Sequence, residues 1–144
     1  MAHAFRILRV DFKHPLPGMI PALFNDAQYQ TLRALLDVSF ARHAALAGNV
    51  ANVNTPGYRR QDASPVFQQE LTRAIEARDV SKLHSLVPQI GIDSSAAPAR
   101  MDGSNVNLER EMVEIAKNSA QYEVSAALIS KRYQMLRAAI TGKT

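Results

Sequence analysis

The chain has 144 residues, of which 47% are hydrophobic but only 6% aromatic, and it contains neither cysteine nor tryptophan. The lack of cysteine excludes disulfide scaffolds, thiolate metal sites and cysteine nucleophiles. The net charge of +4 comes from Lys and Arg residues that are scattered among acids, which argues against a nucleic-acid or lipid-binding patch. No apolar run approaches the ~20 residues that span a bilayer. This composition favours a single all-α domain built by helix-on-helix packing.

The N-terminal segment 1–24 contains Pro15, Pro17 and Pro21 and shows no clean hydrophobic period. We expect it to form a poorly ordered N-terminal extension. Charged residues interrupt the apolar stretches, so a cleavable export signal is not predicted. Met19 is an alternative start to Met1, because the helical pattern begins only a few residues later. The interrupting charges are Arg6, Arg9, Asp11 and Lys13.

A long amphipathic helix is predicted over about residues 26–53, with Asn25 as its cap. Apolar residues recur along one side with alternating spacings of four and three, although Ser39 and His43 also fall on this seam. We interpret His43 as a packed residue of the seam and not as a metal ligand. The apolar seam residues predicted for this helix are Leu32, Leu36, Leu46 and Val50.

The middle of the chain has a weaker pattern. Ser64-Pro65 can start a short helix that presents Phe67, Leu71 and Ile75 on one face. A second short apolar turn ends before Pro88, and residues 88–104 are predicted to form an open loop.

The last third predicts a second long helix, which Asn107 can cap. The spacing of four and three continues from Leu108 to Ile140 without a proline, over about 50 Å of helix. Such a sustained period near 3.5 is typical of a coiled coil. The predicted seam residues of this helix are Leu108, Met112, Ile115, Tyr122, Ile129, Tyr133, Leu136 and Ile140.

No motif for catalysis, a cofactor or a metal is found, so we predict no enzyme. The histidines are too scattered for a local metal site. Three acids at the start of the second helix are interpreted as a solvated first turn that the helix dipole favours. These acids are Glu109, Glu111 and Glu114. The adjacent Arg59 and Arg60 are interpreted as an exposed pair that could contact phosphate or an acidic neighbour.

The stretch "LAGNVANVNTPGYRR", from Leu46 to Arg60, places three asparagines at the end of the first helix. Pro56 should stop this helix by Asn54, and the following Thr-Pro-Gly-Tyr fits a type II turn. A helix stop explains Asn54 and Asn52, but not Asn49, which lies a turn earlier. Because amides both donate and accept hydrogen bonds, we interpret the series as a polar junction with another chain.

This stretch resembles the signature near the N-terminus of bacterial flagellar rod and hook proteins. The later segment Asp102–Glu123 looks like the end of one short member of the proximal rod. The neighbouring proximal rod protein FlgC is the alternative, and a non-flagellar coiled-coil adaptor or a nucleic-acid-binding protein is less favoured. The residues that match the signature are Ala47, Asn49, Ala51, Asn52, Asn54, Thr55, Pro56, Gly57 and Tyr58.

The resemblance implies a structural subunit of the flagellar basal body, located in the periplasmic rod and exported without a cleaved signal by the type III apparatus. It implies contacts with other copies of the chain, with other rod proteins and with membrane-ring or adaptor proteins, but not with nucleic acid or a small-molecule substrate. The proximal rod would link the membrane ring to the distal rod and transmit torque. The signature would be an assembly motif that meets an adjacent subunit.

The hydrophobic pattern divides the chain into four segments, of which the resemblance covers roughly residues 25–141. Residues 1–24 would be the extension, 25–56 the N-terminal helix of the axial core, 57–104 an irregular insert with short helices, and 105–141 the C-terminal coiled-coil helix.

Overall fold

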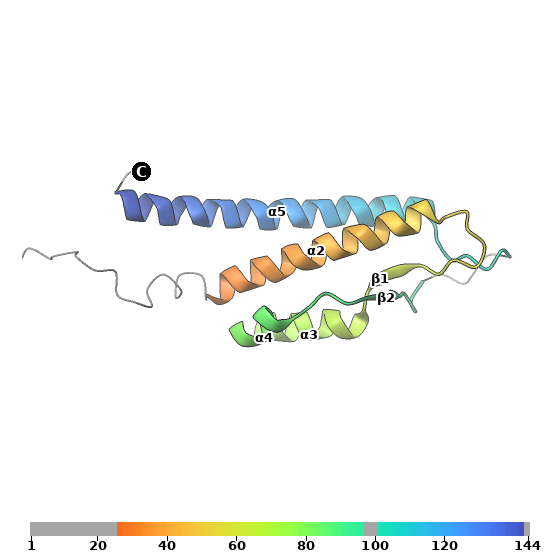
Figure 1. The fold of residues 1–144 in the computed structure, drawn as a ribbon, viewed down its shortest axis with the longest axis horizontal. Helices are drawn as coiled ribbons and strands as arrows, with labels where there is room; N and C mark the ends of the chain where they lie inside the picture. Colours follow the sequence, from red (N-terminus) through yellow and green to blue (C-terminus); the bar gives the residue numbers. More distant parts are fainter. Residues whose placement is uncertain (1–25, 97–100, 143–144) are drawn as a thin grey trace, which may run out of the picture.

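The computed structural model describes residues 26–96 and 101–142, which form three layers (Figure 1). Helix α2 lies between α5 on one side and α3 with α4 on the other. The predicted extension over residues 1–24 and the predicted cap Asn25 lie outside the described residues. The elements in chain order are α2 (Ala27–Ala51), β1 (Gln61–Ala63), α3 (Pro65–Glu76), α4 (Val80–Ser85), β2 (Ile90–Ile92) and α5 (Leu108–Thr141).

The two long helices begin and end where local side chains satisfy their free backbone groups. The carboxylate of Asp26 accepts a hydrogen bond from the Gln28 amide at 3.3 Å and caps α2. The side chain of Asn107 caps α5 as predicted, because it accepts from the Arg110 amide at 3.0 Å. Gly142 ends α5 in the left-handed conformation, with φ of 64°.

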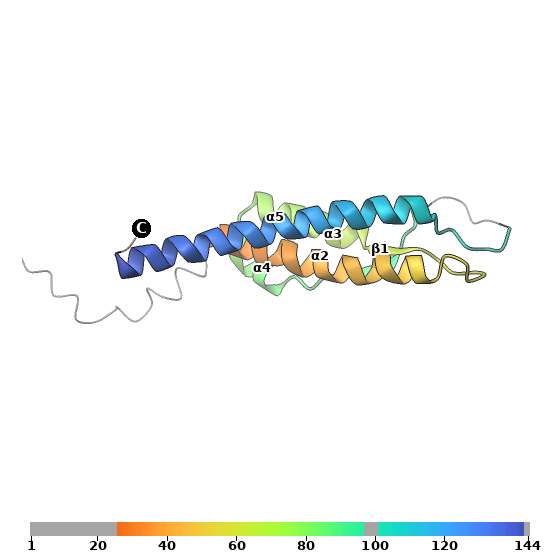
Figure 2. The ribbon, with the colours of Figure 1, turned by 90° about the horizontal axis from the view of Figure 1, so that it is seen from above.

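Helices α2 and α5 pack against each other in antiparallel directions, which confirms the predicted pairing (Figures 1 and 2). Near the start of α2, Arg132 donates to Asp26 at 2.7 Å. Halfway along the pair, the side-chain amide of Asn118 donates to the Ser39 carbonyl at 2.8 Å. The C-terminal end of α5 extends beyond the start of α2, so α2 does not pack against it.

The interface between α2 and α5 is more polar than the predicted seam. The buried positions of α5 are Glu111, Asn118 and Ser125, at intervals of seven residues. Hydrophobicity alone does not reveal such positions, because their side chains are buried through hydrogen bonds. In the single chain Leu46 is buried, and the partly buried residues of the predicted seam are Leu32, Leu36, Val50, Ile115, Ile129 and Leu136. Its remaining residues are exposed, namely Leu108, Met112, Tyr122, Tyr133 and Ile140.

The hydrophobic core lies on the other side of α2. Helix α3 forms from Pro65 as predicted and buries Phe67 and Leu71. Burial of such side chains contributes about 1.5–3 kcal/mol each, so this layer supplies much of the apolar stabilisation. The insert is therefore less irregular than predicted. The buried core residues are Ala34, Val38, Phe67, Leu71, Ala74 and Leu83.

A short two-stranded antiparallel sheet lies beside this core, and α3 and α4 connect its strands. Strand β1 pairs with β2, with Asp62 opposite Gly91 in the register. Residues 90–92 were predicted to belong to an open loop, and this prediction is wrong because their backbone pairs with residues almost thirty positions earlier. Within the two described ranges, no helix is both long enough and apolar enough to cross a membrane.

Candidate functional site

The two segments that carry the family resemblance contact each other at one end of the helix pair. Gly57 has φ of 72°, and the Tyr58 amide donates to the Thr55 carbonyl at 3.2 Å, as the predicted turn requires. The Gly57 amide then donates to the Asp102 carbonyl at 2.9 Å. A Cβ atom at Gly103, where φ is 80°, would lie 3.3 Å from the Gly57 Cα. The close approach therefore favours glycine at position 103, whereas at Gly57 an added Cβ would meet nothing and the positive φ alone favours glycine.

Asn49 connects three elements of the same chain. Its side chain is 0% exposed, and its amide nitrogen donates to the Gln61 carbonyl at 2.7 Å and to Glu111 Oε2 at 2.9 Å. Its amide oxygen accepts from the Gln61 amide at 2.9 Å and from the Tyr58 hydroxyl at 3.3 Å. Both donors and both acceptor positions are thus used. The prediction that Asn49 serves a junction with another chain is wrong, because its partners lie within its own chain.

Asn52 has the local role that a helix stop predicts. Its side chain donates to the Gly48 carbonyl at 2.9 Å and accepts from the Thr55 hydroxyl at 3.2 Å, just after α2 ends. Tyr58 is partly buried. The remaining residues of the motif are exposed, namely Ala47, Ala51, Asn54, Thr55, Pro56 and Gly57.

Arg60 is the centre of a buried ionic cluster. Its side chain is 2% exposed and donates to Glu111 Oε1 at 2.6 Å, to Asp62 Oδ2 at 2.9 Å and to Asp93. Its backbone amide donates to Asn105 Oδ1 at 2.7 Å. The interpretation of Arg60 as an exposed residue is therefore wrong. Three carboxylates offset the cost of burying its charge.

Arg42 extends this cluster along α2. It donates to Asp62 Oδ1 at 2.6 Å and to Glu114 Oε2 at 2.8 Å, and Lys117 also donates to Glu114 at 2.9 Å. Glu111 is fully buried, so its interpretation as part of a solvated first turn is wrong. We use the name Arg60 cluster for Arg42, Asn49, Arg60, Asp62, Asp93, Glu111 and Glu114.

The cluster favours the charged forms of Arg60, Asp62 and Asp93. Burial lowers the pKa of Arg60, but hydrogen bonds to Glu111 and Asp62 outweigh this and raise it. Burial raises the pKa of Asp62, and hydrogen bonds from Arg42 and from backbone bring it below its ordinary value. Burial also raises the pKa of Asp93, and hydrogen bonds from Ser95 and Arg60 bring it below its ordinary value. Asp62 and Asp93 are thus charged and paired at neutral pH.

The chemistry of the cluster is structural. Arginines occupy the carboxylate oxygens, and within residues 26–96 and 101–142 no group of His, Cys, Asp and Glu side chains is arranged to hold a metal ion. Charge-assisted hydrogen bonds are short and directional, so the cluster fixes the two-stranded sheet and the 102–105 turn against the end of the helix pair.

Local patterns could not reveal most of this site. Arg42 is separated from Glu114 by 72 residues, and Arg60 from Asp93 by 33 residues. The only local signal was the surplus of amide side chains before the turn. His43, which was predicted to pack in the seam, is exposed.

Comparisons of the sequence with known proteins identify its family. Residues 98–141 match the family described as the C-terminal part of flagellar basal body rod FlgEFG proteins. Flagellar basal body rod protein FlgB of Escherichia coli K12 is 28% identical over 121 residues, which cover 73% of this chain and 86% of that protein. FlgB of Aquifex aeolicus is 28% identical over 115 residues, covering 75% and 88%.

FlgB of Cereibacter sphaeroides ATCC 17029 is 30% identical over 110 residues, which cover 71% of this chain and 84% of the relative. This similarity extends over most of both proteins. The chain belongs to the FlgB family of flagellar basal body rod proteins and is a structural subunit of the rod, not an enzyme.

Proposed function

We propose that this subunit forms part of the proximal rod, where it links the membrane ring to the distal rod and transmits torque. The Arg60 cluster is the observation that carries this proposal. A subunit of a rotating shaft must keep the angle between its elements under load. Charge-assisted hydrogen bonds suit this task, because their short distances and fixed directions hold the elements that they join in one arrangement.

Membership of the family implies assembly with other rod proteins. We further infer that the chain contacts copies of itself and a membrane-ring or adaptor protein, and that the type III apparatus exports it without a cleaved signal. Support for close packing comes from large apolar side chains that α5 exposes on several sides, since such patches mark interaction surfaces. They include Met112, Val113, Val124, Leu128, Met135 and Ile140.

The proposal is tested by isolating basal bodies from the source organism and quantifying this chain by mass spectrometry. We expect stoichiometric amounts alongside the other rod proteins. Substituting Arg60→Met should lower the recovered amount at least several-fold, whereas the neighbouring exposed Arg59→Met should leave it unchanged. Absence of the unmodified chain from basal bodies that contain the other rod proteins would contradict the proposal.

A further inference from the structure

A hollow lies where α2, α3 and α5 meet, beside the start of α2. Its volume is about 680 Å³, and its apolar lining comes from all three helices. Leu128 and Met135 of α5 are 48% and 58% exposed there, whereas Ile75 of α3 packs against the hydrophobic core. The hollow is therefore an apolar surface that continues the core and that the described residues leave uncovered. We use the name N-terminal hollow for the space lined by Leu32, Ile75, Leu128 and Met135.

The chain enters the described residues at the edge of the N-terminal hollow. Asp26 lines the hollow, and its carboxylate accepts a hydrogen bond from Arg132 at 2.7 Å. This ion pair fixes the end of the preceding segment to α5. An extended chain spans at most about 3.6 Å per residue, so Leu23 and Phe24 lie within about 11 Å of Asp26. Both side chains can therefore reach the hollow.

The segment that precedes Asp26 has two parts of different composition. Residues 1–14 contain three Lys or Arg residues and a single acid, whereas residues 15–25 contain no charged residue. We use the name apolar run for residues 19–24, whose sequence is Met-Ile-Pro-Ala-Leu-Phe. Arg78 and Lys131 also line the N-terminal hollow, so repulsion between like charges disfavours the basic part there. The neutral apolar run matches the hollow better.

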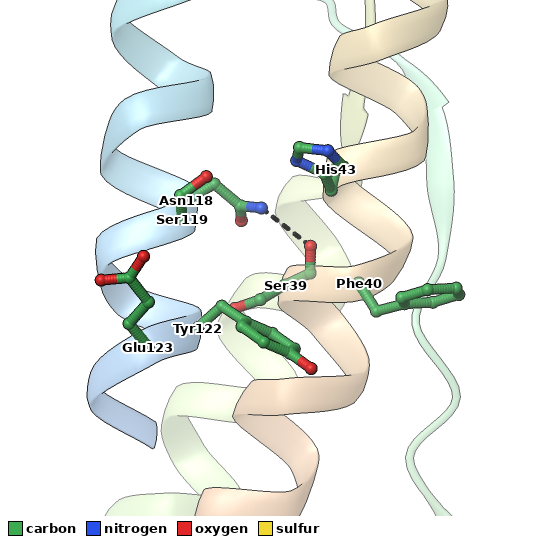
Figure 3. Close-up of a pocket in the computed structure, with 7 residues that line it drawn as sticks. All are labelled: Ser39, Phe40, His43, Asn118, Ser119, Tyr122 and Glu123. Carbon is green, nitrogen blue, oxygen red and sulfur yellow. Dashed lines mark hydrogen bonds between the residues drawn. The ribbon is translucent and has the colours of Figure 1, made fainter. Parts of the chain in front are cut away.

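A second hollow lies farther along the helix pair (Figure 3). Its volume is about 330 Å³, and Ser39 and Asn118 line it, joined across the two helices by a hydrogen bond. Ser39 lies more than three turns after Asp26, which corresponds to about 20 Å along the helix. The N-terminal hollow is thus both the larger of the two and the one that adjoins the end of the preceding segment.

We propose that the apolar run docks in the N-terminal hollow of its own chain, with Leu23 and Phe24 as the side chains that fill it. Their docking covers Leu128 and Met135 and extends the hydrophobic core from α3 to α5. Docking within the chain is favoured over docking on a second copy, because a short tether gives an effective concentration in the millimolar range. The inference goes beyond the proposed function and requires no other subunit.

Tryptophan fluorescence tests the docking, since the chain has no native tryptophan. The purified full chain carrying Phe24→Trp should emit at a shorter wavelength than the chain carrying Phe12→Trp, and iodide should quench it several-fold less. Phe12→Trp is the matched control, because it replaces the same residue type in the charged part of the same segment. Equal emission and equal quenching of the two variants would overturn the proposal.

Substitutions in α5 test whether the N-terminal hollow is the site. Adding Leu128→Ser to Phe24→Trp should remove most of the protection from iodide. Val124→Ser is the control, because Val124 is 60% exposed on the same helix but does not line the hollow. Equal effects of the two serine substitutions would overturn the choice of site. A chain that begins at Met19 keeps the apolar run and should keep the protection, and its loss would overturn the assignment to residues 19–24.

Disulfide formation distinguishes docking within one chain from docking between copies, since the chain has no native cysteine. Oxidation of Leu23→Cys with Met135→Cys should give a cross-linked monomer at every protein concentration. Leu23→Cys with Met112→Cys is the matched control, because Met112 is 55% exposed but lies at the other end of α5. A covalent dimer of the first variant would place the apolar run on a second copy and overturn the proposal, while leaving the rod function intact.

Discussion

The two sides of α2 are held by different kinds of interaction. The side that faces α3 and α4 buries apolar side chains such as Phe67 and Leu71. The side that faces α5 buries Asn49, Asn118 and Glu111 through hydrogen bonds. Apolar burial is non-directional, whereas each buried polar group accepts only a few partners. The difference indicates that the apolar side supplies stability and that the polar side sets the register of the long helices.

The largest effect is expected on the polar side, from Arg60→Met. The change leaves Glu111, Asp62 and Asp93 without their common cation in a buried site, and should cost about 3–5 kcal/mol of unfolding free energy. Urea unfolding of the purified chain would measure this loss. Arg59→Met is the control, and similar losses for the two variants would contradict the central role of Arg60.

On the apolar side, Leu71→Ala should cost about 2–4 kcal/mol, because it removes a buried side chain and leaves a cavity. Thermal unfolding would report the loss. The exposed Val66→Ala on the same helix should have little effect. If Leu71→Ala left the register of α2 on α5 unchanged, as judged by NMR contacts between Ser39 and Asn118, the division between the two sides would be supported. A shifted register would contradict this division.

Asn49→Ala should cost about 1–3 kcal/mol, because buried groups of Gln61 and Glu111 lose their partner. Asn54→Ala is a matched control, since Asn54 belongs to the same motif but is exposed. Chemical denaturation of the dilute, unassembled chain would measure the unfolding free energies of both variants. Equal stability of the two variants would show that the amide of Asn49 acts only after assembly.

Acid should lower the free energy of unfolding through the polar side first, and by less than the substitutions above. The pKa values of Asp62 and Asp93 lie below the ordinary 3.8, and the hydrogen bond from Lys117 holds the pKa of Glu114 below 4.5. The unfolded chain therefore binds protons first as the pH falls. The contribution of these carboxylates to the free energy of unfolding is full above their ordinary pKa values and is lost progressively below about pH 4. A pH series of unfolding free energies would test this, and Arg60→Met should flatten the loss. An equal decline in both proteins would contradict the assignment.

How much the sequence could predict depended on the distance between interacting residues. The start of α3 at Pro65 and the cap Asn107 were predictable, because their signals lie within one helical turn. The pairing of the long helices was also predictable from their period. Burial of the polar residues Glu111 and Asn118 was not predictable, because a hydrophobic pattern does not identify residues that are buried through hydrogen bonds. The surplus amide at Asn49 was noticed, but its partner Glu111 lies 62 residues away.

Hydrogen exchange at the backbone amide of Gln61 tests most directly whether the signature motif is ordered within one chain. This amide donates to the side-chain oxygen of Asn49, so its protection depends on that contact. We expect it to be protected in the dilute, unassembled chain and to lose that protection in Asn49→Ala. Exchange as fast as in an unfolded peptide, with protection appearing only in isolated basal bodies, would show instead that the motif forms between subunits.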